Sequence, residues 1–492
     1  MPSQPPNVLF ILTDQMRADA FGASGNAVVR TPTLDGLCER GVNFTRAYTP
    51  SPVCVSARAS LLTGQLPHRT GCTDNGKPMP PADATSLFGL LSERGYQTHC
   101  VGKTHFAPHG RGYGFQSLAS SEEIPRSADT DDFLNSLIAA GYGHVHEPHG
   151  MRSELYYVPQ VSQLPARLHH TAWTADQGIA FLRRRDRNRP FFLKTSFIKP
   201  HPPFDPPVPW NTLYRMVDMP LPHRPESSRD LQTWHMRHQN RYKYRDGGPD
   251  DNIERMIKAF YYACVSFIDQ QVGRLLDALE KLGERDNTLV IFTSDHGELL
   301  GDYHAFGKRS FLEPAARVPM IVSHPGQLPE GDTCDALTSL VDVMPTCLQA
   351  AGIDVEPYDL DGLSLHDLAT GRAERDHLIG QLNDGPMGLY MIRDERWKYI
   401  YSAPDERAYL FDLDQDPGEM VNRIDAPAAA GEARRLEGRL RERLLGDGCD
   451  ELFEGDTWKR FGRRPDPADP DEVRLTQHAK WIDTITPMAG YR

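Results

Sequence analysis

Residues 7–15 read NVLFILTDQ, an unbroken apolar run that ends in an acid and an amide. A run this apolar, with β-branched residues in it, predicts a strand buried on both faces of a parallel sheet. Asn287–Thr293 (NTLVIFT) repeats the pattern and is followed by Ser294-Asp-His-Gly-Glu298. Ligands of open α/β sheets gather at the carboxyl ends of the strands. We therefore expect the polar residues after these two strands to occupy equivalent positions in the fold.

Strands and helices alternate along the first 375 residues. The further runs that predict strands are Gly41–Tyr48, Gln97–Val101, Pro190–Phe197 and Val318–Val322. The segments that predict helices are Thr31–Arg40, Ser56–Thr63, Thr85–Arg94 and residues 253–282. This alternation predicts an α/β fold with helices on both faces of one sheet. Residues 107–165 are rich in Gly, Pro, His and charged residues, and their apolar residues have no clear period. We interpret this segment as an insertion that shapes the mouth of the site, and not as a separate domain.

The pattern changes near residue 375. Trp397–Tyr401 and Tyr409–Leu413 predict short antiparallel strands, and Ala429–Leu445 predicts a charged helix. These elements indicate a smaller α+β unit. The tail carries scattered aromatic residues that would pack either on a neighbouring subunit, in a homo-oligomer, or on its own chain. The predicted division is a catalytic domain at 1–375, a C-terminal subdomain at 376–454 and a tail at 455–492.

Composition narrows the functional class. The 492 residues include 54 Lys+Arg and 67 Asp+Glu, which gives a net charge of −13 and argues against a general nucleic-acid binder. No apolar stretch has the length of a membrane helix. The N-terminus lacks the basic region and the long apolar region of a secretory signal, so we expect a cytoplasmic protein. The eight cysteines form no CxxC pair, so neither a zinc knuckle nor a disulfide scaffold is indicated.

The first chemical signal is a predicted metal site. Asp14-Gln15 and Asp295-His296 each end a predicted buried strand. Two carboxylates, an amide oxygen and an imidazole suit one hard or borderline divalent ion. For either pair alone, a turn or a buried structural histidine is the simpler interpretation. Two pairs in the same topological position favour the metal.

The second signal is a cysteine close to a predicted helix start. Ser51–Gly64 reads SPVCVSARASLLTG, so Cys54 lies just before this helix, with Arg58 four residues further on. Helix N-termini favour anions and lower the pKa of thiols. The pattern therefore predicts a reactive cysteine, with a buried structural thiol as the alternative.

This segment resembles the signature of type I sulfatases, in which the cysteine is followed by proline or alanine, by arginine, and by a run like ASLLTG. Other family motifs follow in the same order. They are Val101-Gly-Lys-Thr-His105, Lys199-Pro-His201, Gly307-Lys308, Arg317-Val-Pro319, Trp397-Lys-Tyr399 and LFDLDQDPGE at 410–419. The resemblance implies the alkaline-phosphatase-like fold, a large mixed and mostly parallel sheet sandwiched by helices. It also implies hydrolysis of sulfate monoesters of aryl or sugar alcohols.

The resemblance also implies the cofactors. A formylglycine-generating enzyme would oxidise Cys54 to formylglycine. Asp14, Gln15, Asp295 and His296, together with the matured residue, would hold one divalent ion. The ion is calcium by resemblance, with manganese or magnesium as alternatives. One hydroxyl of the hydrated aldehyde would attack sulfur, and the other would then expel sulfate.

Five further residues take predicted roles from the resemblance. Arg58 and Lys103 would steady the nucleophile and its charge. His105 would be the base of the second step. His201 and Lys308 would bind sulfate oxygens and protonate the leaving oxygen, and Lys103 is also predicted to contact the substrate. Taken alone, each lysine could also be a surface residue, and each histidine could be held in place for structural reasons.

Three positions need separate comment. Asn75 is a weaker candidate for a substrate contact, because Asp-Asn-Gly is also a turn sequence. Ser56 stands where the signature has proline or alanine, so the degree of Cys54 conversion has to be measured. Gln15 replaces a common acid and lowers the negative charge of the metal site by one.

Two alternative functions stay open from the sequence. The Asp-Gln and Asp-His pairs also resemble those of phosphonate monoester hydrolases, so phosphonate monoesters or phosphodiesters are the alternative substrates. Lys103 and His105, which those relatives lack, favour sulfate esters. If Cys54 remains a thiol, the chain would be an unmatured anion-binding relative.

Overall fold

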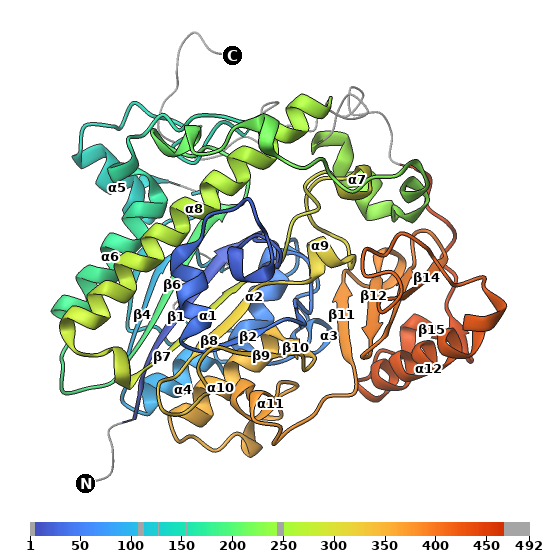
Figure 1. Ribbon diagram of the computed structural model, residues 1–492. Helices are drawn as coiled ribbons and strands as arrows, with labels where there is room; N and C mark the ends of the chain where they lie inside the picture. Colours follow the sequence, from blue (N-terminus) through green and yellow to red (C-terminus); the bar gives the residue numbers. More distant parts are fainter. Residues whose placement is uncertain (1–4, 107–112, 126, 153–155, 244–249, 467–492) are drawn as a thin grey trace.

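The computed structural model describes residues 5–106, 113–125, 127–152, 156–243 and 250–466. Figure 1 shows a large α/β unit and, beside it, a smaller unit built from the C-terminal part of the chain. The large unit contains an eight-stranded sheet. In spatial order its strands are β5 (Ser117–Ser120), β4 (Gln97–Gly102), β6 (Phe191–Pro200), β1 (Asn7–Asp14), β7 (Thr288–Ser294), β8 (Met320–Ser323), β2 (Val42–Phe44) and β9 (Asp332–Cys334).

The sheet is mixed and mostly parallel, which confirms the predicted fold class. β1 lies in the centre and pairs in parallel with β6 and β7. β8 is antiparallel to both of its neighbours, β7 and β2. All eight residues of β1 are buried, because neighbouring strands cover its edges and helices cover its two faces. The apolar run that opens the sequence therefore forms the core of the fold.

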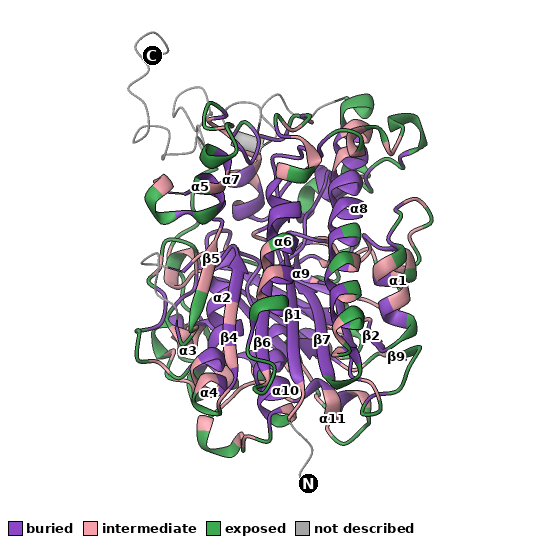
Figure 2. Cartoon of the chain, turned by 90° about the vertical axis from the view of Figure 1, so that its left-hand side faces the viewer, coloured by how far each residue is buried: buried purple, intermediate pink, exposed green. Residues whose placement is uncertain are grey.

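Alternate residues of β1 pack into two separate cores. Leu9 and Ile11 belong to a core shared with α1, α6 and α8, whereas Val8, Phe10 and Leu12 belong to a core shared with α2, α4 and α10. Figure 2 shows the buried strands between these layers. The helices of the large unit are α1 (Pro32–Glu39), α2 (Cys54–Thr63), α3 (Pro67–Thr70), α4 (Leu87–Glu93), α5 (Asp132–Ala139), α6 (His170–Arg184), α7 (Trp234–Lys243), α8 (Asp251–Leu282), α9 (Glu313–Ala316), α10 (Val343–Ala350) and α11 (Leu365–Ala369).

The longest helix, α8, follows the predicted apolar spacing. The Asp250 side chain caps its start by accepting the backbone N–H groups of Asn252 and Ile253. Gly283, at a φ of 68°, ends it in the left-handed conformation that favours glycine. Among the helices of the described residues, none is both long and apolar enough to cross a membrane.

One local prediction was wrong. Gly41–Tyr48 is not one strand: β2 lies in the main sheet, whereas β3 (Ala47–Tyr48) pairs with β10 (Thr338–Ser339) in a second sheet. The segment 107–165 is also more regular than its sequence indicates. Its β5 extends the main sheet, and α5 begins at a side-chain cap made by Asp131. Residues 107–112, 126 and 153–155 of this segment lie outside the described residues.

The smaller unit is an antiparallel sheet covered by one helix. The strands are β11 (Leu378–Leu382), β12 (Leu389–Arg393), β13 (Trp397–Ser402) and β14 (Arg407–Asp412). The helix is α12 (Ala430–Gly446), whose Leu436, Leu440 and Leu444 are buried in the core it shares with this sheet. Trp458, which the sequence analysis places in the tail, lies on a hairpin formed by β15 (Phe453–Glu454) and β16 (Thr457–Trp458).

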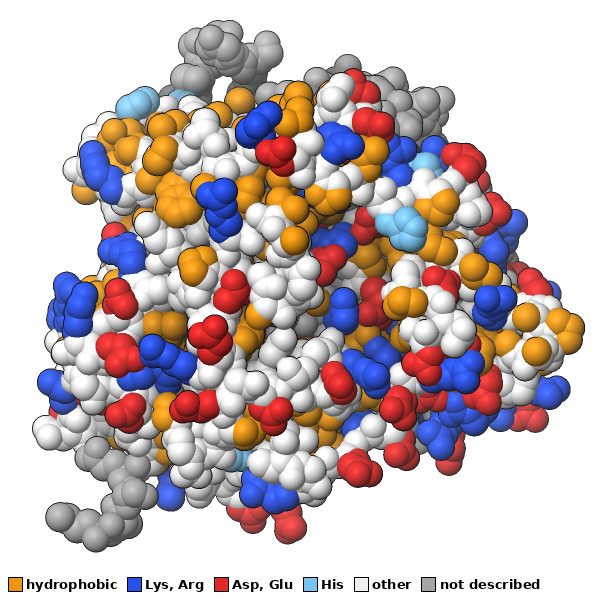
Figure 3. Space-filling view, in the orientation of Figure 1, with side chains coloured by type: hydrophobic (Ala, Val, Ile, Leu, Met, Phe, Trp, Pro, Cys, Tyr) orange, Lys and Arg blue, Asp and Glu red, His pale blue; other side chains and the backbone are white. Residues whose placement is uncertain are grey.

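Trp458 stacks on Tyr390 and Tyr401, with ring centroids 4.9 and 4.3 Å apart. A buried charge network joins the two units. Lys398 Nζ of β13 lies 2.6 Å from Glu313 Oε1 of α9, and the Tyr48 hydroxyl donates to the same carboxylate. Acidic and basic side chains are interspersed over the face drawn in Figure 3, so the surplus of acidic residues is spread over that face.

Candidate active site

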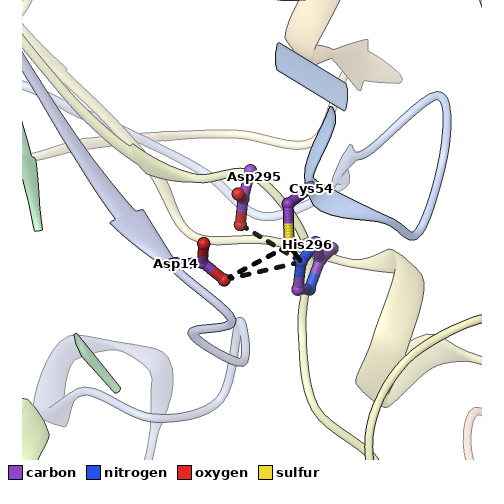
Figure 4. Close-up of side chains that lie close together, drawn as sticks. All are labelled: Asp14, Cys54, Asp295 and His296. Atoms are coloured by element: carbon purple, nitrogen blue, oxygen red, sulfur yellow. Dashed lines mark hydrogen bonds and ion pairs between the residues drawn. The ribbon is translucent and has the colours of Figure 1, made fainter. Parts of the chain in front are cut away.

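The site lies where β1 and β7 end. The two strands are in register, with Thr13 opposite Ser294, so the acids that follow lie side by side. Asp14 and Asp295 are fully buried. His296 Nε2 is 3.6 Å from Asp14 Oδ1 and 3.5 Å from Asp295 Oδ1 (Figure 4). The topological argument from the sequence thus places these three side chains together.

Cys54 faces this group from the other side (Figure 4). It is the first residue of α2 and only 1% exposed, whereas the sequence analysis put it just before the helix. Its Sγ is 3.2 Å from His296 Nε2 and 3.8 Å from Asp14 Oδ1. One potential ligand atom from each of Asp14, Cys54, Asp295 and His296 lies within 4.8 Å of the others. This spacing is close enough for a single ion.

Gln15 supports the assignment of a cation here. Its backbone has a φ of 68°, and its Nε2 donates to the Tyr157 hydroxyl and to Glu298. The other amide atom, Oε1, is buried and has no hydrogen-bond partner among the described residues. A buried oxygen without a donor is costly unless something positive contacts it. His296 Nδ1 lies 3.0 Å from the Gly297 carbonyl, to which it donates, and this leaves Nε2 free to bind a metal.

Arg58 holds the two acids in place. It is 1% exposed, and its guanidinium donates four hydrogen bonds. Its Nε donates to Asp295 Oδ2 at 2.9 Å and its Nη2 to Asp14 Oδ2 at 3.2 Å. Its Nη1 donates to the Lys103 carbonyl at 2.8 Å and to Ser196 Oγ at 2.9 Å. The guanidinium therefore connects the predicted metal ligands to Lys103, which directly follows β4, and to Ser196 within β6.

Lys103 and His105 follow β4 into the site. Lys103 is fully buried, and its Nζ donates to Asp14 Oδ2 at 2.5 Å and to Glu123. The His105 side chain contributes to lowering the pKa of the Cys54 thiol. The carboxylate of Glu122 holds the backbone of this segment by accepting the N–H groups of Thr104 and His105. These hydrogen bonds fix the backbone immediately after Lys103.

His201 and Lys308 complete the wall around Cys54. Lys308 Nζ donates to Cys54 Sγ at 2.8 Å, and Gln239 fixes the Lys308 backbone at both its N–H and its carbonyl. His201 donates from Nδ1 to the Pro202 carbonyl, and one of its ring nitrogens lies within 4.8 Å of Cys54 Sγ. Lys308 and His201 therefore both approach Cys54 Sγ, as the family resemblance predicts.

Asn75 has a different position. Its Oδ1 accepts the backbone N–H of Val55 at 2.9 Å and so caps the start of α2. Because the N-cap residue Val53 has no capping side chain, Asn75 supplies the missing acceptor. Its role as a substrate contact stays a prediction.

The electrostatics favour an anion at position 54. Burial raises the pKa of the Cys54 thiol, but the charges of Lys103, Lys308 and His296 outweigh burial and hold the pKa well below its usual value. Burial and Cys54 raise the pKa of Asp14, but Lys103 in particular brings it down to about 2. The site is therefore preorganised for negative charge before any substrate arrives.

Comparison with known proteins identifies this arrangement. A family model described as sulfatase matches residues 6–353, which is more than half of the chain. The chain belongs to the sulfatase family. A second model, described as the C-terminal part of N-sulphoglucosamine sulphohydrolase, matches residues 301–445. The protein is thus a sulfatase, an enzyme that hydrolyses sulfate esters, as the sequence motifs predict.

Named relatives support the same family. The sulfatase is 33% identical to an arylsulfatase of Clostridium perfringens, over 86% of this chain and 90% of the relative. It is 30% identical to a choline-sulfatase of Rhizobium meliloti, over 87% of this chain and 84% of the relative. Its fold is similar to that of a phosphonate monoester hydrolase of Silicibacter pomeroyi, with a TM-score of 0.78, 26% identity, and coverage of 94% and 100% of the two chains.

The sequence analysis missed several groups of the sulfatase site. Glu298 lies within a motif that was recognised, but its contact with Gln15 was not predicted. Glu123 and Arg152 come from the segment without a clear period, so no spacing rule could have found them. Both are buried, and they pair with each other next to Lys103.

Proposed function

We propose that this sulfatase cleaves aryl or sugar sulfate monoesters through a formylglycine made from Cys54, beside one divalent ion. The observation that supports the proposal is the set of groups around Cys54 Sγ. Lys308 Nζ donates to it, His296 Nε2 lies 3.2 Å from it, and a His201 ring nitrogen lies within 4.8 Å of it. A sulfur atom here stands in for the oxygens of the matured residue. The cations and hydrogen-bond donors around it suit a negatively charged nucleophile and the negatively charged group it attacks.

The ion would be held by Asp14, Gln15, Asp295 and His296, with the matured residue as a further ligand. When bound, it supplies Lewis-acid polarisation of the nucleophile and of the sulfuryl oxygens. Carboxylate and amide oxygens suit a hard cation, so calcium is proposed, with manganese or magnesium as the alternatives that the imidazole ligand admits.

The protein side chains have separate tasks. Arg58 keeps both acidic ligands oriented, and Lys103 adds a positive charge where negative charge develops. His201 and Lys308 would bind the sulfuryl oxygens, with the proton for the leaving oxygen coming from this side. His105 would take the proton whose removal regenerates the aldehyde. The matured residue supplies a hydrated aldehyde with two hydroxyls, so that attack and release use different oxygens.

Peptide mass spectrometry over Ser51–Gly64 tests this proposal. Conversion of Cys54 to formylglycine lowers the residue mass by roughly 18 Da, as the covalent route requires. We expect the shift in protein made together with a formylglycine-generating enzyme, and we expect turnover of 4-nitrophenyl sulfate to follow the converted fraction. Cys54→Ala serves as the unmodifiable control and should be inactive. Turnover by protein whose Cys54 is wholly unmodified would overturn the formylglycine assignment.

Phosphonate monoester hydrolysis is the second candidate function. The fold similarity to a phosphonate monoester hydrolase and the Asp-Gln and Asp-His ligand pairs favour it. Lys103, which is buried, and His105 favour sulfate esters, by resemblance. The ratio of kcat/KM for 4-nitrophenyl sulfate and 4-nitrophenyl phenylphosphonate decides between them, because the leaving group is the same in both esters.

A further inference from the structure

A third carboxylate lies beside the nucleophile and has no role in the proposed mechanism. Glu123 follows β5, is 6% exposed, and comes from the segment that no recognised motif covers. Its carboxylate accepts hydrogen bonds from Lys103 Nζ and from Arg152 Nη2. His201 Nε2 lies 3.4 Å from its Oε1. Two of these three partners are predicted to contact the substrate itself.

The distance to the reacting atoms is short. One potential ligand atom from each of Cys54, Glu123 and His201 lies within 4.8 Å of the others. The sulfuryl group has to occupy the space between Cys54 and His201, so its oxygens would lie about as close to this carboxylate. A site built only to attract anions would not place a negative charge there, since like charges repel strongly where water is excluded.

The surroundings of Glu123 favour the charged form of its carboxyl. Burial raises the pKa of its carboxyl, but His201, Lys103 and Arg152 outweigh burial and hold the pKa well below the usual value. Arg152 is itself buried, with its guanidinium 4.8 Å from the centre of the Tyr156 ring. Lys103, Arg152 and Glu123 together thus carry one net positive charge. Without the Glu123 carboxylate, Lys103 and Arg152 would carry two.

We infer that Glu123 sets the charge selectivity of the site, admitting monoanionic tetrahedral esters and disfavouring dianionic phosphate monoesters. The inference rests on the proposed function, because it uses the position of the reacting group beside Cys54. Sulfate and phosphate esters are nearly equal in size, so the shape of the pocket separates them poorly. They differ by one unit of charge, and a fixed carboxylate next to their oxygens repels the dianion more strongly than the monoanion.

The size of the effect follows from the geometry. One unit charge at about 5 Å, at an effective dielectric constant of about 20, changes the affinity for a second unit charge by roughly 100-fold or more. Lys103 and Arg152 compensate part of this field. We therefore expect removal of the Glu123 charge to change the selectivity between dianion and monoanion by about 30- to 100-fold.

The experiment uses the full-length matured enzyme and three esters of the same leaving group. 4-Nitrophenyl sulfate and 4-nitrophenyl phenylphosphonate are monoanions, and 4-nitrophenyl phosphate is a dianion at about pH 8, because the second pKa of phosphate monoesters is about 6. In Glu123→Gln, kcat/KM for the phosphate should rise about 30- to 100-fold relative to that for the phosphonate. The ratio of sulfate to phosphonate should change less than about threefold, since both carry one charge.

A purely positioning role gives a different result. If Glu123 only orients Lys103 and His201, Glu123→Gln slows all three esters by the same factor and leaves the phosphate-to-phosphonate ratio unchanged. That outcome would overturn the inference. Glu123→Asp, which keeps the charge, should keep the wild-type ratio. Glu226→Gln removes one exposed carboxylate elsewhere and is the charge-matched control, expected to leave all ratios unchanged.

A second variant tests the opposite change, in which a positive charge is removed. Arg152→Met removes the cation that compensates Glu123, so the phosphate-to-phosphonate ratio should fall below that of the wild type. An increase would contradict the inference even if Glu123→Gln failed to fold. The test is separate from that of the proposed function. Wild-type enzyme that carries the aldehyde but does not turn over the sulfate ester refutes the function, whereas an unchanged phosphate-to-phosphonate ratio in the variants refutes the role of Glu123.

Discussion

Arg58→Ala should destabilise the protein and the site together. The variant removes two charge-assisted hydrogen bonds to buried carboxylates and two bonds to neutral acceptors. Breaking a buried ion pair by deleting one partner costs about 3–5 kcal/mol. Asp14 keeps its bond from Lys103, and Asp295 keeps the backbone N–H of Gln15, so neither acid is left without a donor. The whole change therefore stays within about 3–5 kcal/mol, below the simple sum of four bonds.

This free energy converts to a shift of the melting temperature. An unfolding entropy of about 2.1 cal/mol/K per residue gives roughly 1 kcal/mol/K for the 492 residues. Arg58→Ala should therefore lower the Tm by about 3–5 °C in differential scanning calorimetry. The loss should be larger in chelator-treated protein, because Asp14 and Asp295 then repel each other without an ion between them.

Turnover provides the second measurement for Arg58. The kcat/KM for 4-nitrophenyl sulfate should fall by more than about 100-fold, the usual effect of removing a preorganised group beside developing charge. Arg58→Lys is the matched control. It keeps one charge but not the fork that reaches both acids, so it should fall between the wild type and Arg58→Ala. A Tm within about 1 °C of the wild type, together with kcat/KM within about tenfold, would refute the bridging role.

Three further predictions test other parts of the site. His201→Ala should reduce the hydrolysis of alkyl sulfates more than that of nitrophenyl sulfate, because only poor leaving groups need a proton; an equal loss would argue against an acid at this position. Gly297→Ala places a methyl group against the Pro314 carbonyl and should lower stability by about 1–3 kcal/mol in thermal melts, so an unchanged Tm would contradict the close packing behind His296. Chelation should abolish activity, and Ca²⁺ at about 100 times its Kd should raise the Tm by about 3 °C, since it adds about 2.7 kcal/mol; full activity after verified metal removal would exclude the ion from the reaction.

The sequence is most informative where one physical rule acts alone. The apolar runs that became β1 and β7 allow only a buried strand, and parallel pairing then places Asp14 beside Asp295. The helix start at Cys54 was predicted to within two residues. The roles of Lys103, His105 and His201, in contrast, rest on family resemblance, because a lysine or a histidine in a loop has no periodicity to place it.

Other parts of the structure could not be predicted because long-range contacts decide them. Glu123 and Arg152 meet only after β5 has joined the sheet, and no local pattern records that pairing. Gly41–Tyr48 has the composition of one strand, but the pairing of its two ends with different partners divides it between two sheets. Trp458 lies in a polar stretch of sequence, and only the stacking tyrosines of the C-terminal sheet explain its burial.

The burial of Cys54 has a consequence for how the enzyme is made. Only 1% of Cys54 is exposed, and Lys308 and His296 lie against its sulfur. An oxidising enzyme therefore cannot bind this part of α2 in the folded protein. The oxidation that we propose must therefore happen while the chain is still open, during or soon after synthesis. Folding and oxidation then compete for each molecule, and a chain that folds first keeps its thiol. The relative rates of folding and Cys54 oxidation would set the active fraction of a preparation, and this fraction would not change as the folded protein is stored.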